Sequence, residues 1–155
     1  MLILLDIDGV MVPAKSWSAP LALPDGFYEF SKKAVGALND ILKESKAKIL
    51  LTTSHKHNLT LDDWIKIFNN RGIKTTELHR LPPNDDNLNR RDEITHWFST
   101  TNSIVDFLIL DDDKSLNNLS PVLKARLIQT KPLVGLTESH VEKAIKILNT
   151  PLVQV

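Results

Sequence analysis

The chain has 155 residues, of which 42% are hydrophobic and 25% are charged, a composition typical of one folded domain spanning residues 1–155. Its 19 basic and 19 acidic residues leave no formal net charge, which gives no support for nucleic-acid binding through bulk positive charge. The absence of cysteine excludes disulfides, thiolate metal sites and a cysteine nucleophile. Apolar runs are far shorter than the ~20 residues of a membrane span, and no signal peptide is visible, so we expect a cytoplasmic protein without membrane association.

The first part of the chain predicts two buried strands separated by a loop and a helix. Apolar runs at residues 2–5 and 48–51 are typical of strands buried in a sheet. Residues 11–27 contain three prolines and show no clear period, which predicts an irregular loop or small flap. From about residue 28 to 46, apolar residues recur at helical spacing and predict an amphipathic helix.

The middle of the chain predicts a second helix, a short strand and a polar loop. Thr60 is a suitable N-cap for a helix that contains Trp64 as a packing residue, and Gly72 stands where such a helix would end. Residues 73–78 follow as a short strand, and residues 81–89 as a polar loop.

The last part of the chain continues the alternation of helix and strand. A helix is expected over about residues 91–99, strands at 107–110 and 127–128, and a final helix capped by Thr137. Strands that alternate with helices predict an α/β fold, a three-layer sandwich around a mostly parallel, Rossmann-like sheet.

Three of the predicted strands end in polar clusters. The residues that follow them are Asp6-Ile7-Asp8, Thr52-Thr53-Ser54 and Asp111-Asp112-Asp113. Because parallel strands present their carboxyl ends at one edge of the sheet, where ligands of open α/β sheets bind, we expect these side chains to meet. Several carboxylates at one edge repel one another unless a cation neutralises them. Mg²⁺ prefers such oxygen ligands and also binds substrate phosphates.

The spacing of Asp6 and Asp8 suggests a division of roles. If Asp6 ends the strand, both carboxylates face one side while Ile7 packs on the other. One acid could then attack as a nucleophile and the other could serve as general acid and base, while Gly9 permits a sharp turn. A solvated turn would also explain Asp-x-Asp-Gly, but the second acidic strand end, at Asp111, favours catalysis.

The three strand ends resemble motifs of a known family. LLDIDGV (4–10), KILLTTS (48–54) and FLILDDD (107–113) are similar, in this order, to the first, second and fourth motifs of the haloacid dehalogenase-like (HAD) phosphohydrolases. A narrower similarity, to the small HAD domains of RNA-repair proteins, rests on the stretches LTTSH, RRDEI and GLT. The resemblance implies a HAD-like fold with a minimal cap, because only about 20 residues separate the first motif from the next predicted helix.

The resemblance implies a role for each motif residue. Asp6 would be the nucleophile that forms an aspartyl-phosphate, and Asp8 the general acid and base. Thr53, with Thr52 as the competing candidate, would hold the transferring phosphoryl group beside the amide of Ser54. The implied Mg²⁺ ligands are Asp6, Asp8 through its backbone carbonyl, Asp111 and Asp112.

The third motif departs from the family pattern. The family usually has a lysine near the start of the helix before the last acidic strand, and this sequence has Arg90 and Arg91 there. Either could supply the positive charge, although arginine grips phosphate in a fixed fork and is not equivalent to lysine.

Further candidates lie close to the motifs. Gly9 and Trp17, the latter in the predicted flap, could contact the substrate. His55 and His57 follow the second strand and could line the site, although their spacing favours a surface loop.

These features predict a Mg²⁺-dependent phosphatase that acts through an aspartyl-phosphate. A minimal cap implies an open site, suited to a large substrate such as a phosphorylated nucleic-acid end, or to a small molecule covered by a partner subunit. The RNA-repair similarity favours the nucleic-acid end and implies an RNA-repair partner, while the oligomeric state is not predicted. The alternative is a catalytically inactive module that binds phosphate or phosphoproteins, as the missing lysine would suggest. A receiver domain of signalling proteins normally has its acceptor aspartate after a middle strand. The middle strand here is followed by Thr52-Thr53-Ser54, which disfavours that class.

Overall fold

A five-stranded sheet forms the centre of the molecule. The computed structural model describes residues 1–15, 17–102 and 106–152. The strands are β1 (Leu2–Leu5), β2 (Lys48–Leu51), β3 (Leu78–Arg80), β4 (Phe107–Asp111) and β5 (Leu127–Gln129). They lie in the order β3-β2-β1-β4-β5, and each neighbouring pair runs parallel. The carboxyl ends of β2 and β4 therefore flank that of β1.

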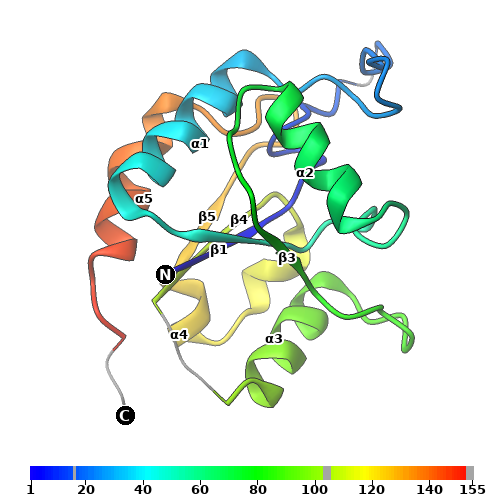
Figure 1. Cartoon of the computed structure of the whole chain (residues 1–155). Helices are drawn as coiled ribbons and strands as arrows, with labels where there is room; N and C mark the ends of the chain where they lie inside the picture. Colours follow the sequence, from blue (N-terminus) through cyan, green and yellow to red (C-terminus); the bar gives the residue numbers. More distant parts are fainter. Residues whose placement is uncertain (16, 103–105, 153–155) are drawn as a thin grey trace.

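Helices cover both faces of the sheet (Figure 1). The α-helices are α1 (Lys32–Ser45), α2 (Leu61–Asn70), α3 (Arg90–Thr100), α4 (Pro121–Lys124) and α5 (Val141–Leu148). The described residues also form the 3₁₀-helices η1 (Lys114–Asn118) and η2 (Glu138–His140). Helices α1, α2 and α5 pack on one face, while α3, α4 and η1 pack on the other. The fold is thus the predicted three-layer α/β sandwich with a Rossmann-like parallel sheet.

The strands are buried on both faces, as their continuous apolar sequences indicate. Successive residues of a strand point to opposite faces, so Ile3 and Leu5 pack with α1, α2 and α5, while Leu4 packs with α3 and η1. All three side chains are fully buried. Burial on both faces is typical of parallel sheets and explains why these strands show no alternation of polar and apolar residues.

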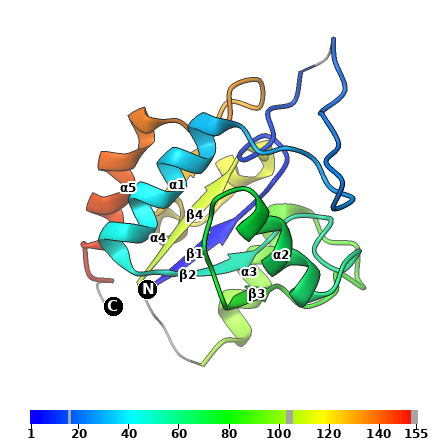
Figure 2. The ribbon, with the colours of Figure 1, turned by 45° about the horizontal axis from the view of Figure 1, so that its top comes forward.

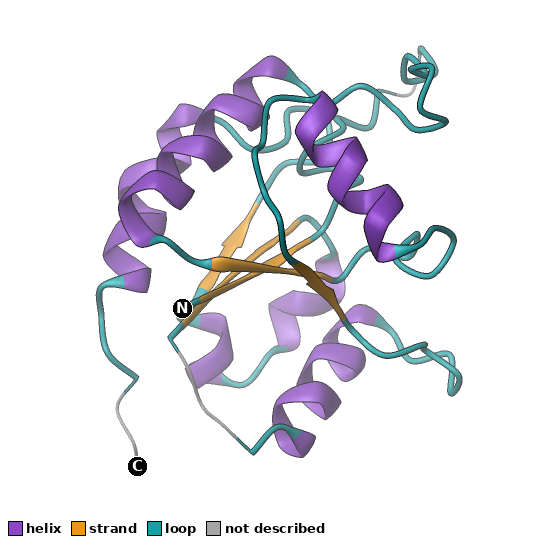
Figure 3. Cartoon of the chain, viewed as in Figure 1, coloured by secondary structure: helices purple, strands orange, loops and turns teal. Residues whose placement is uncertain are grey.

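A connection without helix or strand elements in its described residues leads from β1 to α1 (Figure 3). It begins with a tight turn, in which three successive backbone N–H groups donate to the carbonyl of Ile7. The chain then rises away from the sheet edge, as the blue segment of Figure 2 shows, and an isolated antiparallel bridge joins Ala22 to Tyr28. This connection is the predicted minimal cap.

The first helix begins later than the sequence predicts. Its N-cap is Ser31, whose hydroxyl accepts from the N–H of Ala34 at 3.1 Å. The N–H of Ser31 donates in turn to the carbonyl of Met11. Ser31 is therefore held against the turn after β1, while Tyr28 and Glu29 pair with Ala22 and Leu21, so these residues do not join the helix.

The strand predicted at residues 73–78 is wrong for most of its length. Backbone N–H groups of Ile73 and Thr75 bond to residues at the end of α2, which keeps this stretch away from the sheet. Pairing with β2 begins only at Leu78. The last helix is also shifted, because Thr137 is the N-cap of η2 and α5 begins after it.

No helix in the described parts of the chain is both long and apolar enough to cross a membrane.

Candidate active site

Three carboxylates meet at the carboxyl edge of the central strands. Asp6 follows β1 directly, Asp111 ends β4, and Asp112 comes next. One oxygen atom of each lies within 4.8 Å of the others. Asp6 and Asp111 are 5% and 0% exposed, and Asp112 is partly buried. The strand register creates this meeting, because Leu5 pairs with Leu110 and so places the next residues of both strands side by side.

Burial makes ionisation of this carboxylate cluster unfavourable. It raises the pKa of Asp6 to about 6, against the opposing charge of Arg90. It raises the pKa of Asp111 to about 7, and the charge of Asp6 adds to that effect. Burial and the charge of Asp111 also raise the pKa of Asp112. A bound cation would favour the ionised form of all three carboxylates. Their oxygen atoms are the kind of ligand that a hard divalent cation prefers.

Arg90 supplies positive charge to the carboxylate cluster. It is the first residue of α3, capped by Asn89, and its side chain reaches over the sheet edge. Its Nη1 atom lies 2.8 Å from Asp111 Oδ2, 3.4 Å from Asp6 Oδ1 and 3.0 Å from the hydroxyl oxygen of Thr52. The guanidinium therefore contacts residues from all three central strand ends.

Glu93 forms ion pairs with both Arg90 and Lys56. Glu93, one helical turn further along α3, has its Oε1 atom 3.8 Å from Arg90 Nε. Its Oε2 atom lies 2.8 Å from Nζ of Lys56, and both of these side chains are nearly buried. Sequence reasoning missed this pair. The available signal was weak: Glu93 lies three residues after Arg90, the spacing at which helical side chains are neighbours.

The two threonines after β2 occupy different positions. Both are fully buried. Thr52 aligns with Asp6, because its N–H donates to the carbonyl of Leu5, and its hydroxyl contacts Arg90. The hydroxyl of Thr53 instead accepts from the N–H of His55 at 3.3 Å, within the turn that follows the strand. The adjacent Ser54 is exposed.

Asp8 lies outside the carboxylate cluster. Strand β1 ends at Leu5, so strand alternation does not extend to Asp8, and Ile7 between the two acids is fully buried. The Asp8 side chain is 51% exposed, and its Oδ2 atom lies 2.8 Å from Nε2 of His55. The expectation of a surface loop for His55 missed this contact. Asp8 as a metal ligand through its backbone carbonyl stays a prediction.

Gly9 allows the turn after β1 to pass close to Asp112. Its φ angle is 79°, in the left-handed region that favours glycine, and a Cβ at this position would overlap the carboxylate of Asp112. The hydroxyl of Thr130, the residue after β5, donates to the carbonyl of Gly9 at 2.7 Å. The turn is thus fastened at the edge of the cluster.

Arg91 and Trp17, which were also predicted to belong to the site, have exposed side chains. The side chain of Arg91 pairs with Asp92 at 2.8 Å and is 40% exposed. One helical step separates Arg91 from Arg90, so only Arg90 faces the strand ends. Trp17 is 74% exposed in the connection after β1.

Comparison of the sequence with known protein families gives a match. The model of the family described as "HAD domain in Swiss Army Knife RNA repair proteins" matches residues 2–141, nearly the whole chain. The chain belongs to this HAD family. The match includes the strand ends that carry Asp6, Thr52 and Asp111, and the start of α3. No curated protein matches the chain significantly.

Membership of the HAD family supports a phosphohydrolase-type domain in general terms. Within it, the carboxylate cluster provides a nucleophile candidate and a place for a cation, while Arg90 provides a fixed positive charge beside them. Asp8 and His55 form a separate polar pair that is more exposed than the cluster.

Proposed function

We propose that this HAD domain is a Mg²⁺-dependent phosphatase that hydrolyses a phosphate monoester at the end of a nucleic acid, through an aspartyl-phosphate on Asp6. The observation that carries the proposal is the meeting of Asp6, Asp111 and Asp112 with Arg90 at one sheet edge. Buried charges cost stability, so apolar side chains would be more favourable at this edge if the residues there served only the fold. A functional role therefore explains the buried carboxylates better.

The proposed roles of Asp6 and Asp8 are those that the HAD resemblance implies, and the positions of the two acids support them. A carboxylate oxygen of Asp6 attacks phosphorus, and the bond from phosphorus to the ester oxygen breaks. Asp8 donates a proton to the departing oxygen, and then takes one from the water that attacks the aspartyl-phosphate, which regenerates Asp6 and releases phosphate. The exposure of Asp8 suits this role, because it must reach a leaving group and water in turn.

Mg²⁺, when bound by Asp6 and the pair Asp111 and Asp112, would neutralise charge on the transferring phosphoryl group. Arg90 would bind a phosphoryl oxygen as well, since its fork offers donors beyond the Nη1 atom that Asp111 engages. We assign the hydroxyl that holds the phosphoryl group to Thr52 rather than Thr53, because Thr52 contacts Arg90. The amide of Ser54 and Gly9 remain candidates for the same task.

The nucleic-acid end as substrate rests on two supports. The family is described by its occurrence in RNA-repair proteins, which implies such a substrate and an RNA-repair partner. The minimal cap also suits a large substrate, because the connection between β1 and α1 is too small to enclose one.

A phosphate-binding module without turnover is the second candidate. Arg90 favours it, since this residue stands in place of the usual lysine and is already engaged by Asp111 and Asp6. Such a module would bind a phosphorylated ligand in the presence of Mg²⁺ and release no phosphate.

Phosphate release from p-nitrophenyl phosphate tests the proposal. We expect release that requires Mg²⁺, is abolished by a chelator and falls by about 10³-fold or more in Asp6→Asn, which cannot form the acyl phosphate. The matched control is Asp62→Asn, a substitution of an exposed aspartate on α2. Equal rates in Asp6→Asn and the control would exclude Asp6 as the nucleophile. Mg²⁺-dependent binding without release would favour the second candidate.

A further inference from the structure

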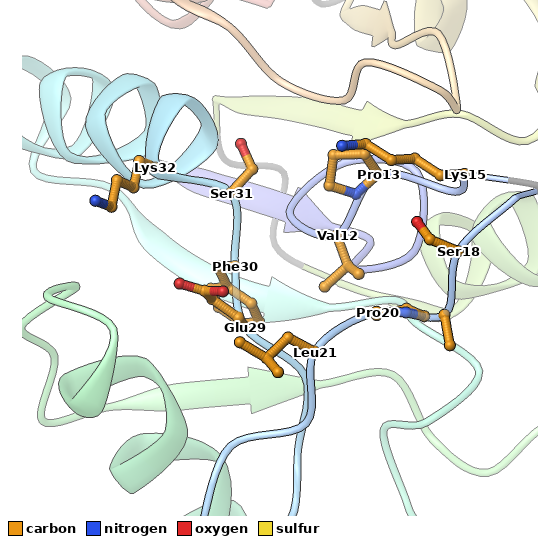
Figure 4. A pocket seen from close by; sticks show the side chains of 11 residues that line it. Val12, Pro13, Lys15, Ser18, Pro20, Leu21, Glu29, Phe30, Ser31 and Lys32 are labelled. Atoms are coloured by element: carbon orange, nitrogen blue, oxygen red, sulfur yellow. The ribbon is translucent and has the colours of Figure 1, made fainter.

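Two adjoining cavities form a groove beside Asp8. One, of about 390 Å³, includes Asp8 in its wall, and the other, of about 330 Å³, extends to the start of α1 and is drawn in Figure 4. They share four lining residues: Val12, Pro13, Lys15 and Pro20. We call the two cavities together the flap groove. Asp8 lines the first of them, and Lys32 lines the second.

The position of the flap groove identifies what would occupy it, if the proposed phosphatase function is correct. In phosphoryl transfer the attacking and leaving oxygens are roughly in line, so the leaving group lies on the side of phosphorus away from Asp6. The same leaving group must be in contact with Asp8, which gives it a proton. A groove with Asp8 in its wall is therefore the place for the leaving group.

The walls of the flap groove are mainly apolar. Val12 and Phe30 are buried beneath it, and Pro13, Pro20 and Leu21 line its sides (Figure 4). A leaving group rich in hydroxyls, such as a sugar or glycerol, would lose hydrogen bonds to water against these side chains. A nucleobase has flat apolar faces and suits such walls.

The charged residues that line the flap groove also suit a nucleotide ligand. Lys15 and Lys32 both line it, and within the described parts of the chain neither side chain forms an ion pair. Glu29 and Asp8 also line it, so the two basic and two acidic side chains leave the groove without formal net charge. Each lysine could bind a phosphate of a strand that continues along the groove, while a carboxylate can accept hydrogen bonds from the amino group of a base.

We propose that the flap groove binds the terminal nucleoside of an oligonucleotide leaving group, with Lys15, and Lys32 on the opposite side of the cavity, binding the phosphodiesters that follow along the strand (Figure 4). The groove volumes are in the range of small-ligand sites and suit one nucleoside with its following phosphate. The substrate class is then a strand end of at least two nucleotides, rather than a free nucleotide, a sugar phosphate or a phosphopeptide.

A series of phosphorylated compounds tests the proposal. The compounds are p-nitrophenyl phosphate, glycerol phosphate, a phosphoserine peptide, nucleoside 3′- and 5′-monophosphates, and dinucleotides that carry a terminal 3′- or 5′-phosphate. We expect kcat/KM for one of the dinucleotides to exceed that for its mononucleotide by about tenfold or more, the effect of one charge-assisted phosphate contact. The affinities of the same compounds for the Asp6→Asn variant, measured as dissociation constants, should follow the same order.

Variants of the two lysines then locate the effect. In Lys15→Gln with Lys32→Gln, the advantage of the dinucleotide should be lost and the dependence of binding on salt should become shallower. The matched control is Lys43→Gln with Lys66→Gln, which removes the same charge from exposed positions on α1 and α2. The control should keep both the advantage and the salt dependence.

The outcomes separate the flap groove from the proposed activity. Lysine-dependent preference for the dinucleotide in the binding assay supports the groove even if no phosphate is released, in which case only the phosphatase function fails. Hydrolysis of p-nitrophenyl phosphate without any dinucleotide advantage overturns the groove and leaves the phosphatase intact. A preference for glycerol phosphate or the phosphopeptide, or equal behaviour of the lysine and control variants, also overturns it.

Discussion

His55 Nε2 lies 2.8 Å from Asp8 Oδ2, although 47 residues separate the two in the sequence. Two further contacts hold His55: its backbone N–H donates to the hydroxyl of Thr53, and its imidazole ring meets the ring of Phe27 edge-on, with 5.6 Å between the ring centroids. Asp8 is therefore oriented by a residue that follows the neighbouring strand. If Asp8 is the general acid, His55 is its positioning residue.

Replacement of His55 should lower kcat most for esters whose leaving group must receive a proton from Asp8. In His55→Asn we expect kcat for an alkyl phosphate to fall by about 10²-fold, and kcat for p-nitrophenyl phosphate to change by less than about threefold, because a good leaving group departs without a general acid. Steady-state rates for esters of graded leaving-group pKa measure this. His79→Asn is the matched control, since His79 forms a similar exposed pair with Glu77 far along the sheet. A uniform loss for all esters would contradict the positioning role.

Arg90 and Arg91 should differ sharply despite being neighbours. Arg90→Gln removes the cation that contacts Asp6, Asp111 and Thr52, so we expect kcat to fall by about 10²–10³-fold, as for loss of one transition-state donor. The metal-free protein should also lose about 3–5 kcal/mol of unfolding free energy, because buried charges lose their partner. Arg91→Gln should change both by little, since its side chain pairs with Asp92 away from the cluster. Kinetics and urea unfolding check both variants, and equal effects would refute the assignment.

Mg²⁺ should stabilise the protein more at pH 8 than at pH 5. The folded-state pKa values of Asp6 and Asp111, about 6 and about 7, exceed the ordinary value of 3.8. The folded metal-free protein thus binds more protons than the unfolded chain between about pH 4 and 7, and its stability falls as pH rises through that window. Mg²⁺ binds the ionised carboxylates and opposes this loss. Thermal unfolding with Mg²⁺ or chelator at the two pH values measures it, and a larger effect at pH 5 would contradict the prediction.

Gly9→Ala should weaken metal binding. The added methyl group would overlap the carboxylate of Asp112 and would also strain a backbone with φ of 79°. We expect the Mg²⁺ concentration for half-maximal activity to rise by about tenfold, one ligand being displaced. Gly26→Ala is the matched control, because its φ of 87° imposes the same strain while nothing lies within 4 Å of the added methyl group. Equal shifts in the two variants would attribute the effect to strain alone.

The meeting of Asp6 and Asp111 could be predicted because it depends on strand ends. Short apolar runs marked β1, β2, β4 and β5 correctly, and parallel strands place their carboxyl ends at one edge. Strand β3 was misplaced, because its sequence Leu-His-Arg has no apolar run and its position depends on how residues 73–77 attach to α2.

The sequence by itself determined the three-layer sheet architecture and the carboxylate cluster, because both follow from buried runs and the acids that end them. The tertiary structure decided which of Arg90 and Arg91, and which of Thr52 and Thr53, faces that cluster. Arg90 and Arg91 differ by about 100° around a helix, and Thr52 and Thr53 differ by one step past a strand, so either could have faced the site until packing set the phase. The contacts of His55 with Asp8 and of Lys56 with Glu93 join turns and helices far apart in sequence, and only the folded chain brings them together.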